Sequence, residues 1–139
     1  MKILNKKIVL DTAGTGDLVD ITGQIRDIVR SSKLEKGSVI VFIVGSTAAI
    51  TTFEYEPGMV RDVKELFERL IPSKRGYHHD ETWNDANGFS HLRASLQGPS
   101  LTIPFDNGEP LLGTWQQVVV AEFDTRPRQR QVVVQLIGE

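Results

Sequence analysis

The stretch Val39–Val44, VIVFIV, decides the fold, because an unbroken and mostly β-branched apolar run is typical of a strand that is buried on both faces. Gly37 and Ser38 introduce this strand with turn-forming residues. Two further stretches, Trp115–Phe123 and Gln131–Ile137, each contain a Val-Val-Val run, and we interpret them as central strands. The chain is therefore predicted to be built around a sheet.

Shorter patterns predict the remaining strands. Ile3–Leu10 mixes apolar positions with two lysines, as a half-exposed strand does, and Leu18–Ile21 and Ala48–Tyr55 suit extended segments. Ser100–Phe105 alternates apolar and polar residues and leads into Asp106-Asn107-Gly108, which is a strong signal for a hairpin turn. The C-terminal part of the chain is thus expected to be all strand.

Apolar residues at helical spacing predict three helices. Asn87 is the expected cap of the third helix, and the polar segment Lys74–Asp85 before it is expected to be a surface loop. The fold class is therefore α+β: one compact domain over residues 1–139, with a largely antiparallel or mixed twisted sheet of about seven or eight strands. The three helices cover Ile21–Ser32, Pro57–Pro72 and Phe89–Leu96.

Composition excludes several classes of function. Sixteen basic and eighteen acidic residues give a net charge of -2, so the chain has no basic field for nucleic acid. No cysteine is present, which excludes disulfides and thiolate metal sites. Polar residues interrupt the apolar run at the N-terminus, MKILNKKIVLD, so it predicts neither a signal peptide nor a membrane span, and we expect a cytoplasmic protein without a membrane partner.

The candidate chemistry lies in Tyr77–Gly98, YHHDETWNDANGFSHLRASLQG, which holds all three histidines. His79 and Asp80 are expected on a loop, and His91 follows in the first turns of a helix. Two such histidines can bind Zn²⁺ or a similar divalent ion if carboxylates, water or a neighbouring subunit complete the coordination. The alternative is that His91 packs locally and the other two histidines lie on the surface.

At these residues the sequence resembles the YjbQ family. Gly113–Gln116 resembles the second motif of that family, and Val132–Gly138 resembles its last strand. The resemblance implies a compact α+β fold, assembly as a homotrimer, a divalent metal near the histidines and, in some members, a weak thiamine-phosphate synthase activity. The residues that match the central motif are Tyr77, His79, Asp80, Trp83, Asp85, Asn87, Gly88, Ser90, His91, Leu92, Ala94, Ser95, Leu96, Gly98, Pro99 and Ser100.

One position departs from the family pattern. Many relatives carry a His-Thr pair where this chain has Gly45-Ser46, so one potential metal ligand is missing. His79 and His91 would then need carboxylates or water to complete a site, which we expect to bind a metal weakly. Gly45, Ser46 and Thr47 could instead accept a phosphate or carboxylate in the space that the imidazole leaves.

Three functional interpretations stay open. The first is an enzyme acting on a small phosphorylated metabolite, the second is a non-catalytic protein that binds an anionic metabolite, and the third is a structural oligomer. Because Arg93 lies about 200° around the helix from His91, it is expected either to serve a neighbouring subunit or to form a structural ion pair. In the enzyme, the expected catalytic residues are His79, Asp80, Asn87 and His91, the metal ligands are His79 and His91, and the substrate-binding residues are Ser46, Thr47, Arg93 and Gln116.

Overall fold

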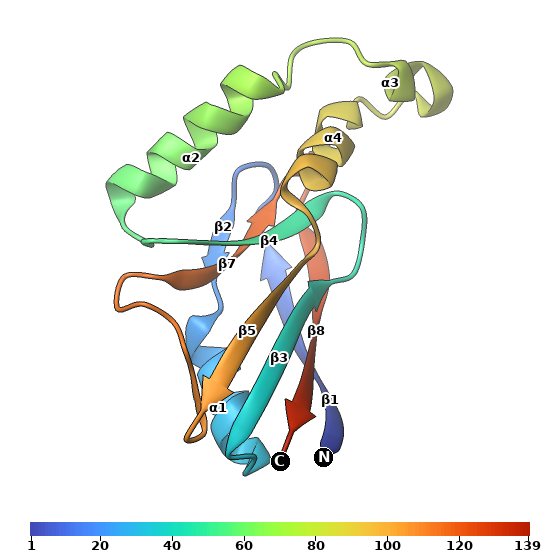
Figure 1. Cartoon of the computed structure of the whole chain (residues 1–139). Helices are drawn as coiled ribbons and strands as arrows, with labels where there is room; N and C mark the ends of the chain where they lie inside the picture. Colours follow the sequence, from blue (N-terminus) through green and yellow to red (C-terminus); the bar gives the residue numbers. More distant parts are fainter.

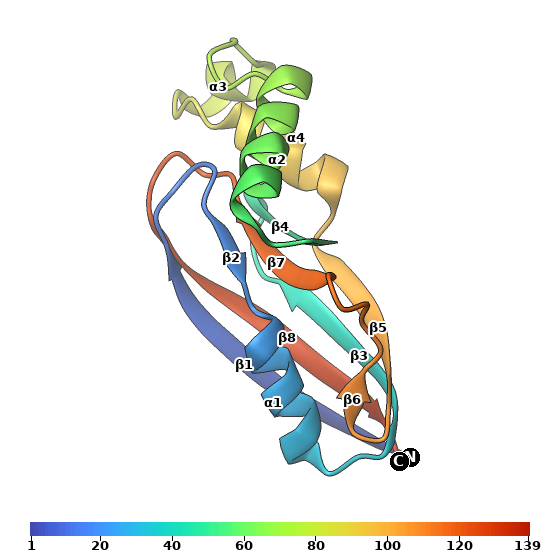
Figure 2. The same ribbon diagram turned by 90° about the vertical axis from the view of Figure 1, so that its left-hand side faces the viewer.

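The computed structural model describes residues 1–139 and contains eight strands and four helices (Figure 1). Helices α2, α3 and α4 gather at one end of the molecule, and α1 lies toward the other end, where both termini are found (Figures 1 and 2). None of the four helices is long and apolar enough to cross a membrane. In chain order the elements are β1 (Lys2–Thr12), β2 (Leu18–Asp20), α1 (Thr22–Ser32), β3 (Lys36–Ile43), β4 (Ala48–Phe53), α2 (Pro57–Leu70), α3 (His78–Trp83), α4 (Gly88–Gln97), β5 (Ser100–Asp106), β6 (Glu109–Pro110), β7 (Gln117–Glu122) and β8 (Arg128–Gly138).

The strands form two antiparallel sheets. The larger sheet has the order β1-β8-β3-β5-β6, and the smaller one has the order β2-β7-β4. The predicted α+β class and the number of strands are confirmed, although the strands divide between two sheets. The predicted hairpin is also present, since Asn107 and Gly108 have φ angles of 51° and 70° between β5 and β6.

The strand that is buried on both faces is β7 and not β3. In β3 the side chains of Val39, Val41 and Ile43 are fully buried, but Phe42 between them is 42% exposed, so only one face is covered. In β7 the consecutive residues Val118–Ala121 are all fully buried. The prediction for β3 was wrong because hydrophobicity along a strand does not show which of its faces another layer covers.

Two apolar cores explain this difference. The first lies between the two sheets and includes α1, with Ile25, Val41 and Val120 among its members. The second lies on the other face of the smaller sheet, where α2 and α4 pack against residues such as Val119 and Phe123 (Figure 2). The smaller sheet is thus the middle layer of the molecule, and its central strand meets apolar side chains on both sides.

The segment predicted as a loop, Lys74–Asp85, contains the short helix α3. Asp80 stabilises its first turn, because one carboxylate oxygen accepts a hydrogen bond from the backbone N–H of Tyr77 at 3.2 Å. No residue of α3 is buried. The helix therefore has no apolar stripe, which is the signal by which the other three helices were predicted.

Candidate functional site

The two histidines expected to form a site lie together. His79 projects from α3 and His91 from α4, and the centroids of their rings are 4.3 Å apart. Asp80 joins the two helices, since its Oδ1 accepts a hydrogen bond at 2.8 Å from the N–H of Gly88, the first residue of α4. Asn87 occupies the N-cap position of α4 as predicted, but its side chain makes no capping hydrogen bond, and Asp80 provides one instead.

A carboxylate faces His79. The Nδ1 atom of His79 lies 3.5 Å from Asp85 Oδ1 and 3.9 Å from Asp80 Oδ1. This nitrogen is buried and has no hydrogen-bond partner. One ligand atom from each of these three residues lies within 4.8 Å of the others. Asn87 lies beside Asp85, and with its amide turned so that the nitrogen faces the carboxylate it donates to both oxygens, at 3.0 and 3.1 Å. A buried nitrogen without a partner beside two carboxylates is a donor set that fits a divalent ion.

The environment of His91 favours its neutral form. Burial lowers the pKa of His91 below its usual range, and the nearby His79 lowers it further. The carboxylates of Asp124 and Asp85 act in the opposite direction without reversing the shift. His91 is therefore an unprotonated imidazole at neutral pH, and it can accept a proton or bind a metal.

A polar cavity of about 280 Å³ adjoins the histidines. Within it Arg128 holds Asp124 with two hydrogen bonds to Oδ2, at 2.9 Å from Nε and 2.7 Å from Nη2. Burial raises the pKa of Asp124, but the bonds from Arg128, Thr125 and Thr47 outweigh it and lower the pKa to about 2. Asp124 is thus ionised at every physiological pH. The cavity is lined by Asp85, Asn87, Asp124, Thr125, Arg126 and Arg128.

A buried network supports this cavity from beneath. Thr47 donates to Asp124 Oδ2 at 3.0 Å and accepts from Arg130 Nη2 at 2.7 Å. Arg130 also pairs with Glu122 through two hydrogen bonds of 2.7 and 2.8 Å. Glu122 is fully buried, and burial raises its pKa even though Arg130 opposes the shift. The network fixes the end of β7, and with it the position of Asp124.

The charged members of this network were not predicted as part of the site. Their signal was present, because acidic and basic residues interrupt the ends of two strands that are otherwise rich in valine. A charge at the end of an apolar strand must be paired when the strand is buried, and this pairing could have been inferred. The missed residues are Glu122, Asp124, Arg128 and Arg130.

Of the residues expected to bind substrate, Thr47 is joined to the site through Asp124, but Ser46 and Gln116 lie elsewhere. Ser46 lines a separate hollow of about 190 Å³, and Gln116 contacts Thr52 at 3.4 Å beside another hollow. The space beside Gly45 is occupied. A Cβ atom on this glycine would lie 2.8 Å from Nη1 of Arg130. The guanidinium therefore fills the place where a bound phosphate was expected.

Arg93 takes the second of its two expected roles. Its side chain is 4% exposed and forms an ion pair of 2.8 Å with Glu68 on α2. Its Nε and Nη2 also donate to the carbonyl oxygen of Ile71, at 3.0 and 2.8 Å, which fastens the end of α2 to α4. Within the chain, Arg93 is therefore a structural ion-pair partner that lies apart from His79 and His91.

The fold, with its two antiparallel sheets and the helices gathered at one end, is that of the YjbQ-like α+β proteins. The chain belongs to the family described as UPF0047 protein YjbQ-like, whose model matches residues 6–139. The resemblance seen in the sequence is thereby confirmed.

Relatives and solved structures agree with this assignment. A UPF0047 protein of Archaeoglobus fulgidus is 37% identical over 131 residues, which cover 94% of this chain and 99% of the relative. A UPF0047 protein of Methanothermobacter thermautotrophicus is 36% identical over 139 residues, covering 100% and 95%. The crystal structure of a YbjQ-like protein of unknown function from Sulfolobus solfataricus superposes with a TM-score of 0.92 at 31% identity, covering 99% of each chain.

Proposed function

We propose that the protein is a metal-assisted enzyme that acts on a small phosphorylated metabolite. The observation that carries the proposal is the Nδ1 atom of His79, which is buried, lacks a hydrogen-bond partner and lies 3.5 Å from Asp85. A buried polar atom without a hydrogen-bond partner is unfavourable unless a ligand supplies the missing partner. A divalent ion bound by His79 and Asp85 would satisfy the nitrogen and balance the carboxylate charge.

The metal would supply a positive charge that polarises a phosphoryl oxygen of the substrate. His79 and Asp85 would hold it, with His91 adjacent. Asp80 is less available, because its two oxygens already accept hydrogen bonds from the backbone of Tyr77 and Gly88.

The arginines of the polar cavity suit an anionic substrate. Arg128 uses Nε and Nη2 to hold Asp124, which leaves Nη1 free to donate. Arg126 lines the same cavity and makes no ion pair. Arginine binds phosphate through several N–H groups at once, so these two side chains can orient a phosphorylated molecule beside the histidines. His91, which is neutral at pH 7, is then placed to accept a proton from the bound molecule.

Calorimetry tests the metal site directly. Titrating the full chain with Mn²⁺ or Zn²⁺ at pH 7.5 is expected to show weak binding of one ion, which His79→Ala abolishes and Asp85→Asn weakens about tenfold or more. His78→Ala is the matched control, because His78 is the exposed neighbour of His79. Undiminished binding by the His79→Ala variant would exclude the proposed ligand set.

A second titration tests the anion site. Inorganic pyrophosphate is expected to bind the wild-type protein, and Arg126→Ala should weaken this binding, whereas Arg61→Ala on α2 should not. The family resemblance makes the coupling of a pyrimidine pyrophosphate to a thiazole phosphate the first reaction to assay, and we expect at most a weak rate because Gly45 replaces a histidine of many relatives. Binding of pyrophosphate without turnover of any phosphorylated substrate would favour the non-catalytic interpretation.

We also propose that the protein assembles as a homotrimer. The support is the outer face of the five-stranded sheet, where apolar side chains remain exposed on neighbouring strands. Phe42 pairs with Val133, and Val133 pairs with Lys7. Side chains alternate between the two faces of a strand, so every second residue counted from these three lies on the same face of the sheet. An exposed apolar sheet face is typical of a subunit interface. The large exposed side chains on it are Ile3, Val9, Phe42 and Val44.

A further inference from the structure

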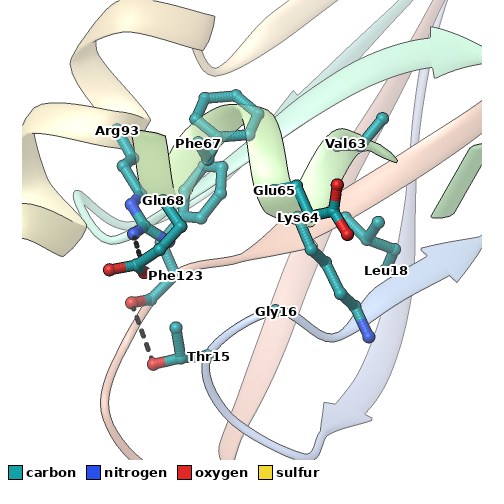
Figure 3. Close-up of a pocket in the computed structure, with 10 residues that line it drawn as sticks. All are labelled: Thr15, Gly16, Leu18, Val63, Lys64, Glu65, Phe67, Glu68, Arg93 and Phe123. Carbon is teal, nitrogen blue, oxygen red and sulfur yellow. Dashed lines mark hydrogen bonds and ion pairs between the residues drawn. The ribbon is translucent and has the colours of Figure 1, made fainter. Parts of the chain in front are cut away.

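A second cavity, of about 330 Å³, lies beneath helix α2 and shares no lining residue with the polar cavity of the candidate site (Figure 3). Its apolar surface comes from four side chains on α2, β2 and the end of β7, and two cations and two carboxylates complete it. A volume of this size is at the lower end of the range for small-molecule sites. The lining residues are Thr15, Gly16, Leu18, Val63, Lys64, Glu65, Phe67, Glu68, Arg93 and Phe123.

Arg93 offers this cavity an unused hydrogen-bond donor. Its guanidinium lies 4.9 Å from the ring centroid of Phe89 and 5.9 Å from that of Phe123, so aromatic rings surround it. Nε and Nη2 bond to Ile71 and Glu68, but Nη1 makes no hydrogen bond. The side chain as a whole is 4% exposed, but Nη1 is not among the buried atoms that lack a partner, so it can be reached from the cavity.

Lys64 supplies a second positive charge. Its methylene groups pack beside Gly16, at 3.6–3.8 Å from the place where a Cβ on that glycine would be, which is ordinary van der Waals distance. The ammonium forms no ion pair, and in Figure 3 it extends past Gly16. Lysine and arginine thus lie at different parts of an apolar surface, and each keeps a donor free.

The two carboxylates balance the two cations in charge, but they do not occupy all of their hydrogen-bond donors. Both oxygens of Glu68 are in use, since Oε1 accepts from the N–H and hydroxyl of Ser73 and Oε2 accepts from Arg93. These bonds lower the pKa of Glu68, with the Ser73 backbone making the largest contribution, so it stays ionised and bound to its partners. Glu65 is the one carboxylate of the cavity that makes no hydrogen bond, so neither the ammonium of Lys64 nor Nη1 of Arg93 is bound to it.

We propose that this cavity is a second small-molecule site, for a compact aromatic or branched carboxylic acid. The apolar body would pack against Phe67, Phe123 and Val63, and the carboxylate would accept hydrogen bonds from Nη1 of Arg93 or from Lys64. An apolar floor with one or two placed cations is the arrangement that binds amphipathic anions, whereas the candidate site has no apolar lining residue. The two cavities therefore select different chemical classes.

The test uses 3-phenylpropionate as the probe and the uniformly ¹⁵N-labelled full chain. Amide signals of residues that line the cavity, among them Gly16, Val63 and Phe123, are expected to shift and saturate at millimolar concentration. Lys64→Gln should weaken binding several-fold, and the neutral 3-phenylpropionamide should bind about tenfold more weakly than the acid. Lys74→Gln, which alters a lysine outside the cavity, is the matched control.

A further variant fills the space. Val63→Trp is expected to abolish binding, and its thermal transition shows whether it has folded. If Val63→Trp does not fold, the comparison of acid, amide and Lys64→Gln still decides the question. Equal binding of acid and amide, stronger binding of 2-phenylethylamine than of the acid, or shifts confined to residues outside the cavity would each overturn the proposal.

Discussion

His79 and His91 lie with their ring centroids 4.3 Å apart, although they belong to different helices. Two imidazolium rings at this distance would repel each other, so the pair resists carrying two charges. The chemistry of the site therefore depends on the protonation of the two rings together.

The pKa of His91 provides the first prediction. We expect a ¹H–¹⁵N NMR titration to give His91 a pKa below the ordinary value of about 6.5. His79→Gln should raise this pKa, because it removes one of the two causes that lower it. His78→Gln should leave it unchanged, since His78 projects into solvent. A His91 pKa that falls in the His79→Gln variant would show that the rings interact in another way.

Stability should depend on pH through the same residue. Because the folded pKa of His91 lies below the unfolded value, the unfolded chain binds more protons between the two values. The contribution of His91 is thus fully present above about pH 6.5 and is lost as the pH falls through that value toward the folded pKa. Urea unfolding at pH 7.5, 6.5 and 5.5 should show a smaller loss of stability in His91→Asn than in the wild type. The same change of the free energy of unfolding with pH in both proteins would contradict this.

The buried pair of Glu122 and Arg130 should be important for stability. Arg130→Met leaves the fully buried carboxylate without its partner, which should lower the free energy of unfolding by about 3–5 kcal/mol. The double variant Arg130→Met with Glu122→Met should lose less than the single variant, because no unpaired charge remains. Lys36→Met is the control: its pair with Glu139 is exposed, so its loss should change the free energy of unfolding little. Denaturant unfolding measures all three.

Asp80 is predicted to hold the two histidine-bearing helices together. Asp80→Ala removes the hydrogen bonds to Tyr77 and Gly88 and should lower stability by about 1–2 kcal/mol. Hydrogen exchange should become faster at the starts of α3 and α4, and metal binding should weaken because His79 is no longer fixed. Glu81→Ala, on the exposed side of α3, should show none of these changes.

The proposed trimer depends on an exposed sheet face. Phe42→Glu places a charge in the middle of that face and should convert trimers into monomers in light scattering at micromolar concentration. Ser31→Glu on α1 adds the same charge elsewhere and should leave the mass unchanged. A wild-type protein that is monomeric under these conditions would remove the proposal.

Local patterns in the sequence predicted most of the elements but not how they are layered. The hairpin at Asn107 and Gly108 and the long helix α2 follow from turn chemistry and apolar spacing, which act between near neighbours. The two-sided burial of β7 depends on the packing of a second sheet and two helices, which no local pattern contains. Helix α3 was missed because its stability comes from Asp80 rather than from an apolar stripe.

Only the part of the candidate site that is formed by residues close together in the chain was predicted. His79, Asp80, Asp85 and His91 are close in the chain, so their density in one stretch indicated a site. Arg130, in contrast, reaches Thr47 across 83 positions of the chain, and a contact of that range leaves no periodic signal. The role expected for Ser46 relied on the small residues Gly45–Thr47 and that for Gln116 on a family motif, and the fold places both outside the cavity.

The order of the strands also determines when the molecule can fold during its synthesis. Strand β8, which is made after the other strands of its sheet, lies between β1 and β3, and Lys2 pairs with Gly138. Until β8 has left the ribosome, β1 has no neighbour in its sheet, and the apolar inner face of β3 lacks one of its two partners. The nascent chain therefore carries unpaired strand edges until β8 has emerged, and it needs protection from aggregation over that whole period.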